Sequence, residues 1–181
     1  MNARLYLALA LITAACGDAT EPVATADPCA NWNSQRFFAQ ATAQEVQACI
    51  QAGRSTTERN NDLQSPLCMA AQFTSYPEVI RTLIQNGASI HDWCAFNGWE
   101  RSPCARANAL HVAADVNTNP EVIQALIDAG VSLDHGGGPS GWTPLSVAYL
   151  FGAPPEVIAV LQANGATGSI DILPIGTLCG P

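Results

Sequence analysis

The segment Pro77-Glu78-Val79-Ile80 decides the fold, because it returns as Pro120-Glu121-Val122-Ile123 and again as Pro155-Glu156-Val157-Ile158. The two steps are 43 and 35 residues long. A glycine stands ten residues after each proline, at Gly87, Gly130 and Gly165. A related start precedes each proline with the same two steps, as Ser65-Pro66-Leu67, Asn108-Ala109-Leu110 and Thr143-Pro144-Leu145. Two landmarks that keep one register indicate an internal duplication.

Each copy predicts a helix that ends near the glycine. Proline fixes φ and needs no backbone donor, so it suits the first turn of a helix. Apolar residues then recur at helical spacing, in the first copy at Val79, Ile80, Leu83 and Ile84. Gly87 follows this apolar stripe, where a left-handed C-terminal cap is common. Because one unit cannot bury its own stripe, we expect the units to stack into an array.

The units resemble ankyrin repeats, a family whose pattern opens on T-P-L-H-x-A-A and closes on L-L-x-x-G-A. Here the pattern reads Ser65-Pro66-Leu67-Cys68-Met69-Ala70-Ala71 and Leu83-Ile84-Gln85-Asn86-Gly87-Ala88. The last copy starts at Gly141-Trp142-Thr143-Pro144-Leu145, and an earlier, weaker unit covers about residues 34–62. The resemblance implies an all-α solenoid of about four helix-turn-helix units with hairpin loops over residues 29–168.

The overall charge of the chain is acidic. Its 181 residues include 15 acidic and 7 basic side chains, which give a formal net charge of −8. This balance argues against a nucleic-acid partner, since the chain could not neutralise a row of phosphates. No apolar run reaches the roughly 18–20 residues that a membrane-spanning helix needs. A membrane contact is therefore expected only through a lipid anchor.

The N-terminus reads as an export signal. Residues 1–15 combine Arg4 with a short apolar stretch and small residues, which is typical of a secretory signal peptide. Thr13-Ala14-Ala15-Cys16 resembles the lipobox of bacterial lipoproteins, which implies acylation of Cys16; ordinary cleavage after Ala15 is the alternative. Residues 16–28 are expected to form a flexible tether. By resemblance, Gly17 favours the outer membrane, on the periplasmic side of the envelope; a soluble periplasmic or secreted protein is the alternative.

The cysteine count agrees with export. With Cys16 assigned to lipid, six cysteines remain for disulfides in an oxidising compartment: Cys29, Cys49, Cys68, Cys94, Cys104 and Cys179. Six cysteines allow fifteen pairings, which the sequence cannot resolve. Short separations favour Cys29–Cys49 and Cys94–Cys104, which leaves Cys68 and Cys179 as the third pair.

Candidate partner-binding residues lie in an insert near residues 91–107, which lengthens the first repeat step. Inserts in stacked repeats map to surface loops, often on the binding side. This one contains Trp93, Phe96, Trp99 and Arg101, residue types that dominate interaction hot spots. The alternative is that these rings fold back into a small local core.

Two further features are candidates for partner contact. Trp142 occupies a position that is solvent-facing and variable in the ankyrin family, and its equivalents are Gln64 and Ala107. Phe73, Val116 and Phe151 align at the end of the first helix of each unit, where they are expected either to form a binding stripe or to pack partly buried. The tail, residues 169–181, contains isoleucines and a leucine that are expected to cap the last unit.

No catalytic or metal-binding pattern stands out. The chain has no nucleophile elbow, H-E-x-x-H motif or phosphate loop. His111 takes the histidine position of the ankyrin pattern, which implies a structural hydrogen bond. A metal site built from His91, Cys94, Cys104 and His111 fits no ligand spacing, so no metal and no cofactor are expected.

The sequence thus predicts a non-catalytic protein-binding module displayed in the bacterial envelope, with an unidentified protein partner. An immunity role, in which the acidic surface covers a toxic effector, is one hypothesis within this class. Two alternatives remain: an enzyme or stress factor that uses free thiols or a metal, and a purely structural lipoprotein.

Overall fold

The described part of this computed structural model is all-helical and comprises residues 27–95, 107–137 and 141–168. Two isolated bridges, Cys94 with Ala107 and Gly137 with Trp142, are the β-type pairings in these ranges. The eight helices of these ranges are α1 (Gln35–Phe38), α2 (Ala43–Gln51), α3 (Pro66–Phe73), α4 (Pro77–Gln85), α5 (Ala109–Val116), α6 (Pro120–Asp128), α7 (Pro144–Phe151) and α8 (Pro155–Ala163).

The helices begin where the sequence predicts. Pro77, Pro120 and Pro155 each open an outer helix at its first turn. The inner helices have polar caps: the side chains of Ser65 and Thr143 each accept a hydrogen bond from the backbone N–H three residues on. These local signals explain why the helix boundaries follow the repeat.

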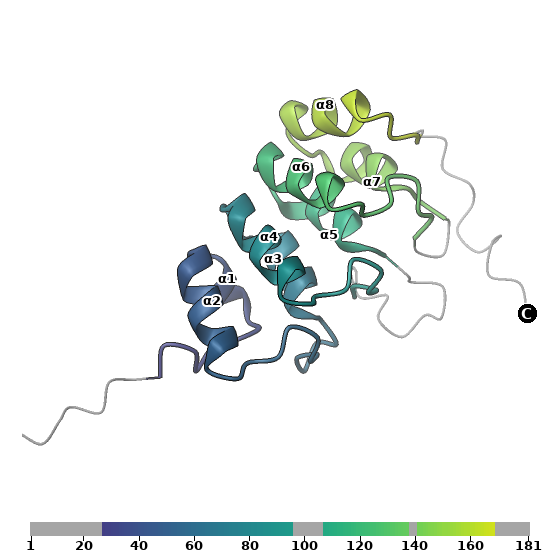
Figure 1. The fold of residues 1–181 in the computed structure, drawn as a ribbon. Coiled ribbons are helices and arrows are strands. Elements are labelled where there is room, and N and C mark those ends of the chain that lie inside the picture. The colour runs from purple at the N-terminus through teal and green to yellow at the C-terminus, as the bar shows by residue number, and fades with distance from the viewer. Residues whose placement is uncertain (1–26, 96–106, 138–140, 169–181) are drawn as a thin grey trace, which may run out of the picture.

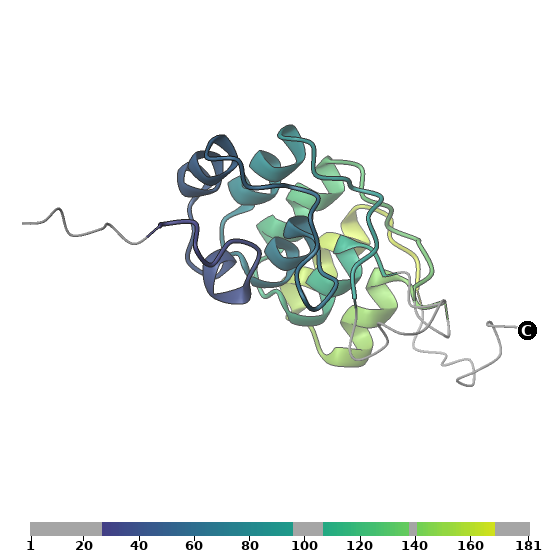
Figure 2. The same cartoon turned by 90° about the horizontal axis from the view of Figure 1, so that it is seen from below.

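The helices form two layers in a stepped array (Figures 1 and 2). Helices α1, α3, α5 and α7 pack side by side in the inner layer, and α2, α4, α6 and α8 in the outer layer. Each inner helix also packs on the outer helix that follows it in units 2 to 4 (α3–α4, α5–α6 and α7–α8). We call α1–α2 unit 1. The long loops lie on one side of the array, the loop side, and the short inner-to-outer turns on the other, the turn side.

Small and branched apolar side chains fill the space between units. Ala70, Ala71, Ala113 and Ala114 are fully buried, which lets neighbouring inner helices approach closely. Leu83, Leu126 and Leu161 are fully buried at the same register of the outer helices. The apolar stripe of each unit is therefore covered by the adjacent unit, as stacking predicts.

Glycine ends the outer helices as expected. Gly87 and Gly130 have φ of +92° and +88°, in the left-handed region that other residues avoid. Their backbone N–H groups donate to the carbonyls of Ile84 and Ile127, which closes the last turn.

Cys29–Cys49 forms a disulfide as predicted, but the second predicted pair is wrong. Cys94 is bonded to Cys68, with 5.5 Å between their Cα atoms, and not to Cys104. The reason is that the loop after α4 returns to the start of α3, where the carbonyl oxygen of Trp93 lies 3.7 Å from Sγ of Cys68. The expected Cys68–Cys179 pair is thereby also wrong. Cys104 and Cys179 lie outside the described residues, as do Cys16, the signal peptide and the tail 169–181.

Asp27, the first described residue, is tied to unit 1 and the loop after it. Its carboxylate accepts a hydrogen bond from the backbone N–H of Cys29 and forms an ion pair with Arg54. No helix in the described ranges is both long and apolar enough to cross a membrane.

Candidate functional site

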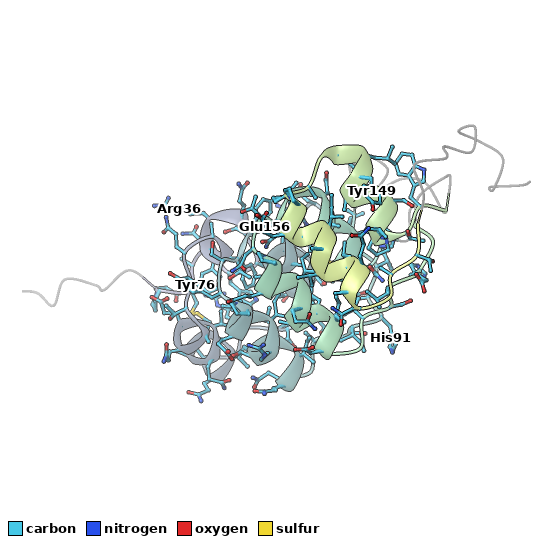
Figure 3. The ribbon with its side chains drawn as sticks, turned by 90° about the horizontal axis from the view of Figure 1, so that it is seen from above. Arg36, Tyr76, His91, Tyr149 and Glu156 are labelled. Atoms are coloured by element: carbon cyan, nitrogen blue, oxygen red, sulfur yellow. A yellow bond between two sulfur atoms is a disulfide. The ribbon has the colours of Figure 1, made fainter. Side chains whose placement is uncertain are left out.

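Five large apolar side chains are exposed in the described ranges, and they fall into two groups. Leu63 and Trp93 lie in the loops on the loop side, with exposed fractions of 45% and 37%. Tyr76, Val116 and Phe151 lie at the opposite ends of the helices, on the turn side. Figure 3 shows Tyr76 on this second side, with His91 among the loops on the first. The array therefore has two separate surfaces on which apolar groups meet solvent.

A fixed arginine organises the first surface, which we call the loop face (Arg59, Leu63, Asp92 and Trp93). The guanidinium of Arg59 lies over the indole of Trp93, 4.1 Å from the ring centroid. The same guanidinium forms an ion pair with Asp92 and donates to the backbone carbonyls of Leu63 and Trp93. Arginine and indole thus hold each other in one geometry while the indole stays partly exposed.

Leu63 adopts a backbone conformation that is costly for a leucine. Its φ is +59°, in the left-handed region, where a bulky side chain is an outlier. The turn is held by Asn60, whose side-chain oxygen accepts from the backbone N–H groups of Asp62 and Gln64. Asparagine or glycine would adopt this conformation at lower cost, so Leu63 is a strained and exposed residue of the loop face.

The disulfide between Cys68 and Cys94 supports the loop face from beneath. Both cysteines are fully buried, and Cys94 directly follows Trp93. Since Cys68 lies in α3, the bond ties the loop that presents Trp93 to the helical core. The loop face is therefore organised before any partner binds.

The structure brings together the rings of Trp142, just before α7, and Phe151, the last residue of α7. Their ring centroids are 6.3 Å apart, so the indole lies along the helix. Trp142 is half-buried and not the solvent-facing ring that the sequence predicts, and its equivalents Gln64 and Ala107 are buried. Trp142 and Ala107 are bridged to Gly137 and Cys94, and Gln64 donates to the carbonyl of Ala95, so this position packs against loop backbone. Phe151 itself is exposed, whereas Phe73 is half-buried against the core, as the packing alternative has it.

His111 is a buried structural residue. Its Nε2 donates to the carbonyl of Trp142 at 2.8 Å, and its Nδ1 contacts Asn108. Burial lowers the pKa of His111 to about 4, because the charged ring would lose its hydration; the nearby His135 also lowers this pKa. The ring therefore stays neutral at ordinary pH and links unit 3 to the loop before α7.

The carboxylates beside histidines in the sequence are engaged elsewhere. Asp92 pairs with Arg59, as described above. Asp134 accepts hydrogen bonds from the backbone N–H and the hydroxyl of Thr167, and these bonds lower its pKa. In the described ranges no group of three or more His, Cys, Asp or Glu side chains is placed to hold a metal ion. Asp92 and Asp134 thus each hold two segments of the array together.

A groove of about 680 Å³ lies at the free end of unit 1. Its walls include Phe37, Ala48 of α2 and the Cys29–Cys49 disulfide. Glu45, on its rim, accepts from the backbone N–H and hydroxyl of Thr42 as part of a helix cap. This recess is mainly apolar.

Sequence reasoning found only part of the loop face. Trp93 was expected there, but Arg59 and Leu63 were not. A usable signal was present, since Leu63 is a lone large apolar residue after Asn60-Asn61-Asp62. The other predicted loop residues, Phe96, Trp99 and Arg101, lie outside the described residues.

No family model matches the chain, and no curated protein is significantly similar to it. What the geometry defines is an all-helical array of stacked helix pairs with two disulfides and a preorganised aromatic surface on its loop side.

Proposed function

We propose that this chain is an exported, lipid-anchored protein of the ankyrin type that binds one protein partner through its loop face, without catalysis. The observation that supports this most directly is the exposed indole of Trp93, fixed by Arg59 beside a strained and exposed Leu63. Trp and Arg supply much of the energy of known protein interfaces. A surface that is fixed in advance loses little conformational freedom on binding.

The ankyrin assignment rests on sequence register and layer order together. The T-P-L-type starts open the inner helices, the Pro-Glu-Val-Ile segments open the outer helices, and left-handed glycines end the latter. Inner helices contact inner helices and outer contact outer, which is the packing that such repeats require. In this family the loops and inner helices form the usual binding surface.

Export and lipid anchoring rest on the N-terminal pattern and on the two disulfides. Disulfides persist in oxidising compartments such as the periplasm. Acyl chains on Cys16 would hold the array at the envelope surface, with the outer membrane as the favoured site. An immunity role, in which the bound partner is a toxic effector, is the specific form of this proposal that a neighbouring effector gene would support.

A cross-linking pull-down from the native envelope tests the proposal, with the full chain as bait and mass spectrometry as readout. We expect one dominant partner, which Trp93→Ala removes and Tyr76→Ala, a similarly exposed aromatic on the other side, retains. Leu63→Asn sharpens the test. It should weaken partner capture yet leave the melting temperature unchanged or higher, because asparagine tolerates a positive φ.

The opposite results favour the alternatives. A Leu63→Asn variant that melts lower but captures the partner normally would make Leu63 a structural residue. Absence of any enriched partner would favour a structural lipoprotein. Free thiols on protein from the oxidising compartment would favour a thiol-dependent enzyme or stress factor.

A further inference from the structure

The turn side of the array has two rows of side chains that the loop face does not use. In units 2 to 4 the inner helix ends on an apolar residue, Phe73, Val116 or Phe151. Five residues later a glutamate stands in the first turn of each outer helix, Glu78, Glu121 or Glu156. Since α3, α5 and α7 pack side by side, as do α4, α6 and α8, the apolar row runs parallel to the glutamate row. Figure 3 shows Glu156 on this side, away from His91.

Units 3 and 4 differ from unit 2 in how much of the apolar row meets solvent. Phe73 is half-buried, whereas Val116 and Phe151 are 47% and 44% exposed. Two large exposed apolar side chains therefore stand at one register of α5 and α7, which pack side by side.

In units 3 and 4 the equivalent glutamates form no ion pair within the described ranges. In unit 2, Glu78 forms an ion pair with Arg81 three residues on. The equivalents of Arg81 are Gln124 and Ala159, and the amide of Gln124 is hydrogen-bonded to Asp128 instead. Residues 107–168 contain five acidic side chains and neither arginine nor lysine. We define the turn face as Val116, Glu121, Phe151 and Glu156.

We propose that the turn face is a second docking surface, for a helical segment of the partner that presents apolar and basic side chains together. This inference rests on the proposed binding function and adds a surface and a partner chemistry to it. Val116 and Phe151 present exposed apolar surface to apolar side chains of such a segment, and Glu121 and Glu156 present negative charge beside it to basic ones. The spacing agrees, because helices pack about 8–10 Å apart. Residues seven apart on a partner helix are separated by about 10.5 Å.

Charge argues against the two other occupants. An anionic lipid surface would be repelled by the glutamate row. A second copy of this chain, with its net charge of −8, would bring acidic groups against acidic groups.

Direct titration tests the docking surface without the natural partner. The probe is a synthetic 21-residue helical peptide with leucine repeating on one face and lysine flanking it, and the same peptide with glutamate for lysine is the control. Binding to the purified full chain is measured by fluorescence anisotropy at low and high salt. We expect the lysine peptide to bind, the affinity to fall with salt, and the glutamate peptide not to bind.

Paired variants assign that binding to the turn face. Glu121→Gln with Glu156→Gln should weaken it about fivefold, whereas Glu58→Gln with Asp62→Asn, an equal charge change at exposed loop residues, should change it less than about twofold. Val116→Ser with Phe151→Ser should weaken binding about tenfold. Tyr76→Ser, on the same side beside the neutralised Glu78, should not.

Equal weakening by both charge pairs, or no effect of the serine pair, would overturn the inference in favour of non-specific attraction. The result is separable from the proposed function. Pull-down of a partner that depends on Trp93 but not on the turn-face variants would keep the loop-face function and refute the second surface. Specific peptide binding with no partner captured through Trp93 would support the turn face as a docking surface and refute the loop-face function.

Discussion

The two halves of the array follow one repeat pattern but are held together by different chemistry. Residues 27–95 contain both disulfides and all three ion pairs found in the described ranges. Residues 107–168 have no arginine or lysine, and their units are tied by hydrogen bonds, such as that between Asn164 and Gln124 and those from Thr167 to the carboxylate of Asp134. The difference teaches that the repeat specifies where helices start and end, while each junction between units is stabilised by whatever its own loop supplies.

Asparagine and histidine side chains form hydrogen bonds that join unit 3 to its neighbours on both sides. The side chain of Asn117 donates to the carbonyls of Ala71 and Thr74, both at 2.9 Å, and so joins unit 3 to unit 2. His111 joins unit 3 to the loop before unit 4. The first half has hydrogen bonds of the same kind, such as that from Asn86 to Gln47, and adds the Arg59–Asp92 ion pair and the Cys68–Cys94 bond.

Removing the disulfides should have the largest effect, and it should destabilise the first half more than the second. We expect Cys68→Ser with Cys94→Ser to lower the free energy of unfolding by about 3 kcal/mol, since the bond closes a loop between residues 26 apart. Cys29→Ser with Cys49→Ser should cost about as much. Hydrogen exchange read by mass spectrometry should rise in α1–α4 and change little in α5–α8. Uniform exchange across both halves would mean that the array unfolds as one unit.

Lowering the pH should destabilise the second half by protonating His111. Its pKa is about 4 in the folded chain against 6.5 when unperturbed, so the unfolded chain binds the proton more tightly. Stability should therefore fall as pH decreases from about 6.5 to about 4 and then level off, a total loss of about 3 kcal/mol from this group. Urea unfolding at several pH values measures the slope. His111→Gln should flatten it and His91→Gln, on an exposed loop, should not; equal slopes in both variants would remove His111 as the cause.

The smallest expected effects come from substituting one glycine in each half, Gly137 and Gly53, by alanine. A Cβ on Gly137 would lie 2.8 Å from Nε2 of His111 and 3.1 Å from Cα of Ala107. We expect Gly137→Ala to cost about 2 kcal/mol through this overlap. A Cβ on Gly53 would have no atom within 4 Å, and only its φ of +94° would be unfavourable for alanine. We therefore expect Gly53→Ala to lower the free energy of unfolding by about 1 kcal/mol. Thermal unfolding compares the two variants, and a larger loss at Gly53 would show that backbone strain outweighs crowding at His111.

Much of the helical framework could be read from local signals. Pro120 marks a helix start and Gly130 its end because both act through their own backbone, whatever surrounds them. The buried alanine pairs also followed from the repeat, since close stacking of units admits no larger side chain there.

The candidate site was predicted less completely, for reasons that lie in the loops. Trp93 could be chosen by residue type, but its partner Arg59 is 34 residues earlier and reaches it only because two loops lie together on one side of the array. The exposure of Leu63 depends on a positive φ that no propensity assigns to leucine.

The sequence by itself determined the number and register of the helical repeats, because proline, cap residues and glycine act within a few positions of one another. It also determined the acidic balance and the lack of basic residues in the second half. Only the tertiary structure decided that Cys94 bonds to Cys68, that Trp142 packs against Phe151, and that Val116 and Phe151 meet solvent. Those outcomes depend on which segments the stacking of units brings together. Stacking places residues in contact that are far apart along the chain, so their sequence separation does not predict the contact.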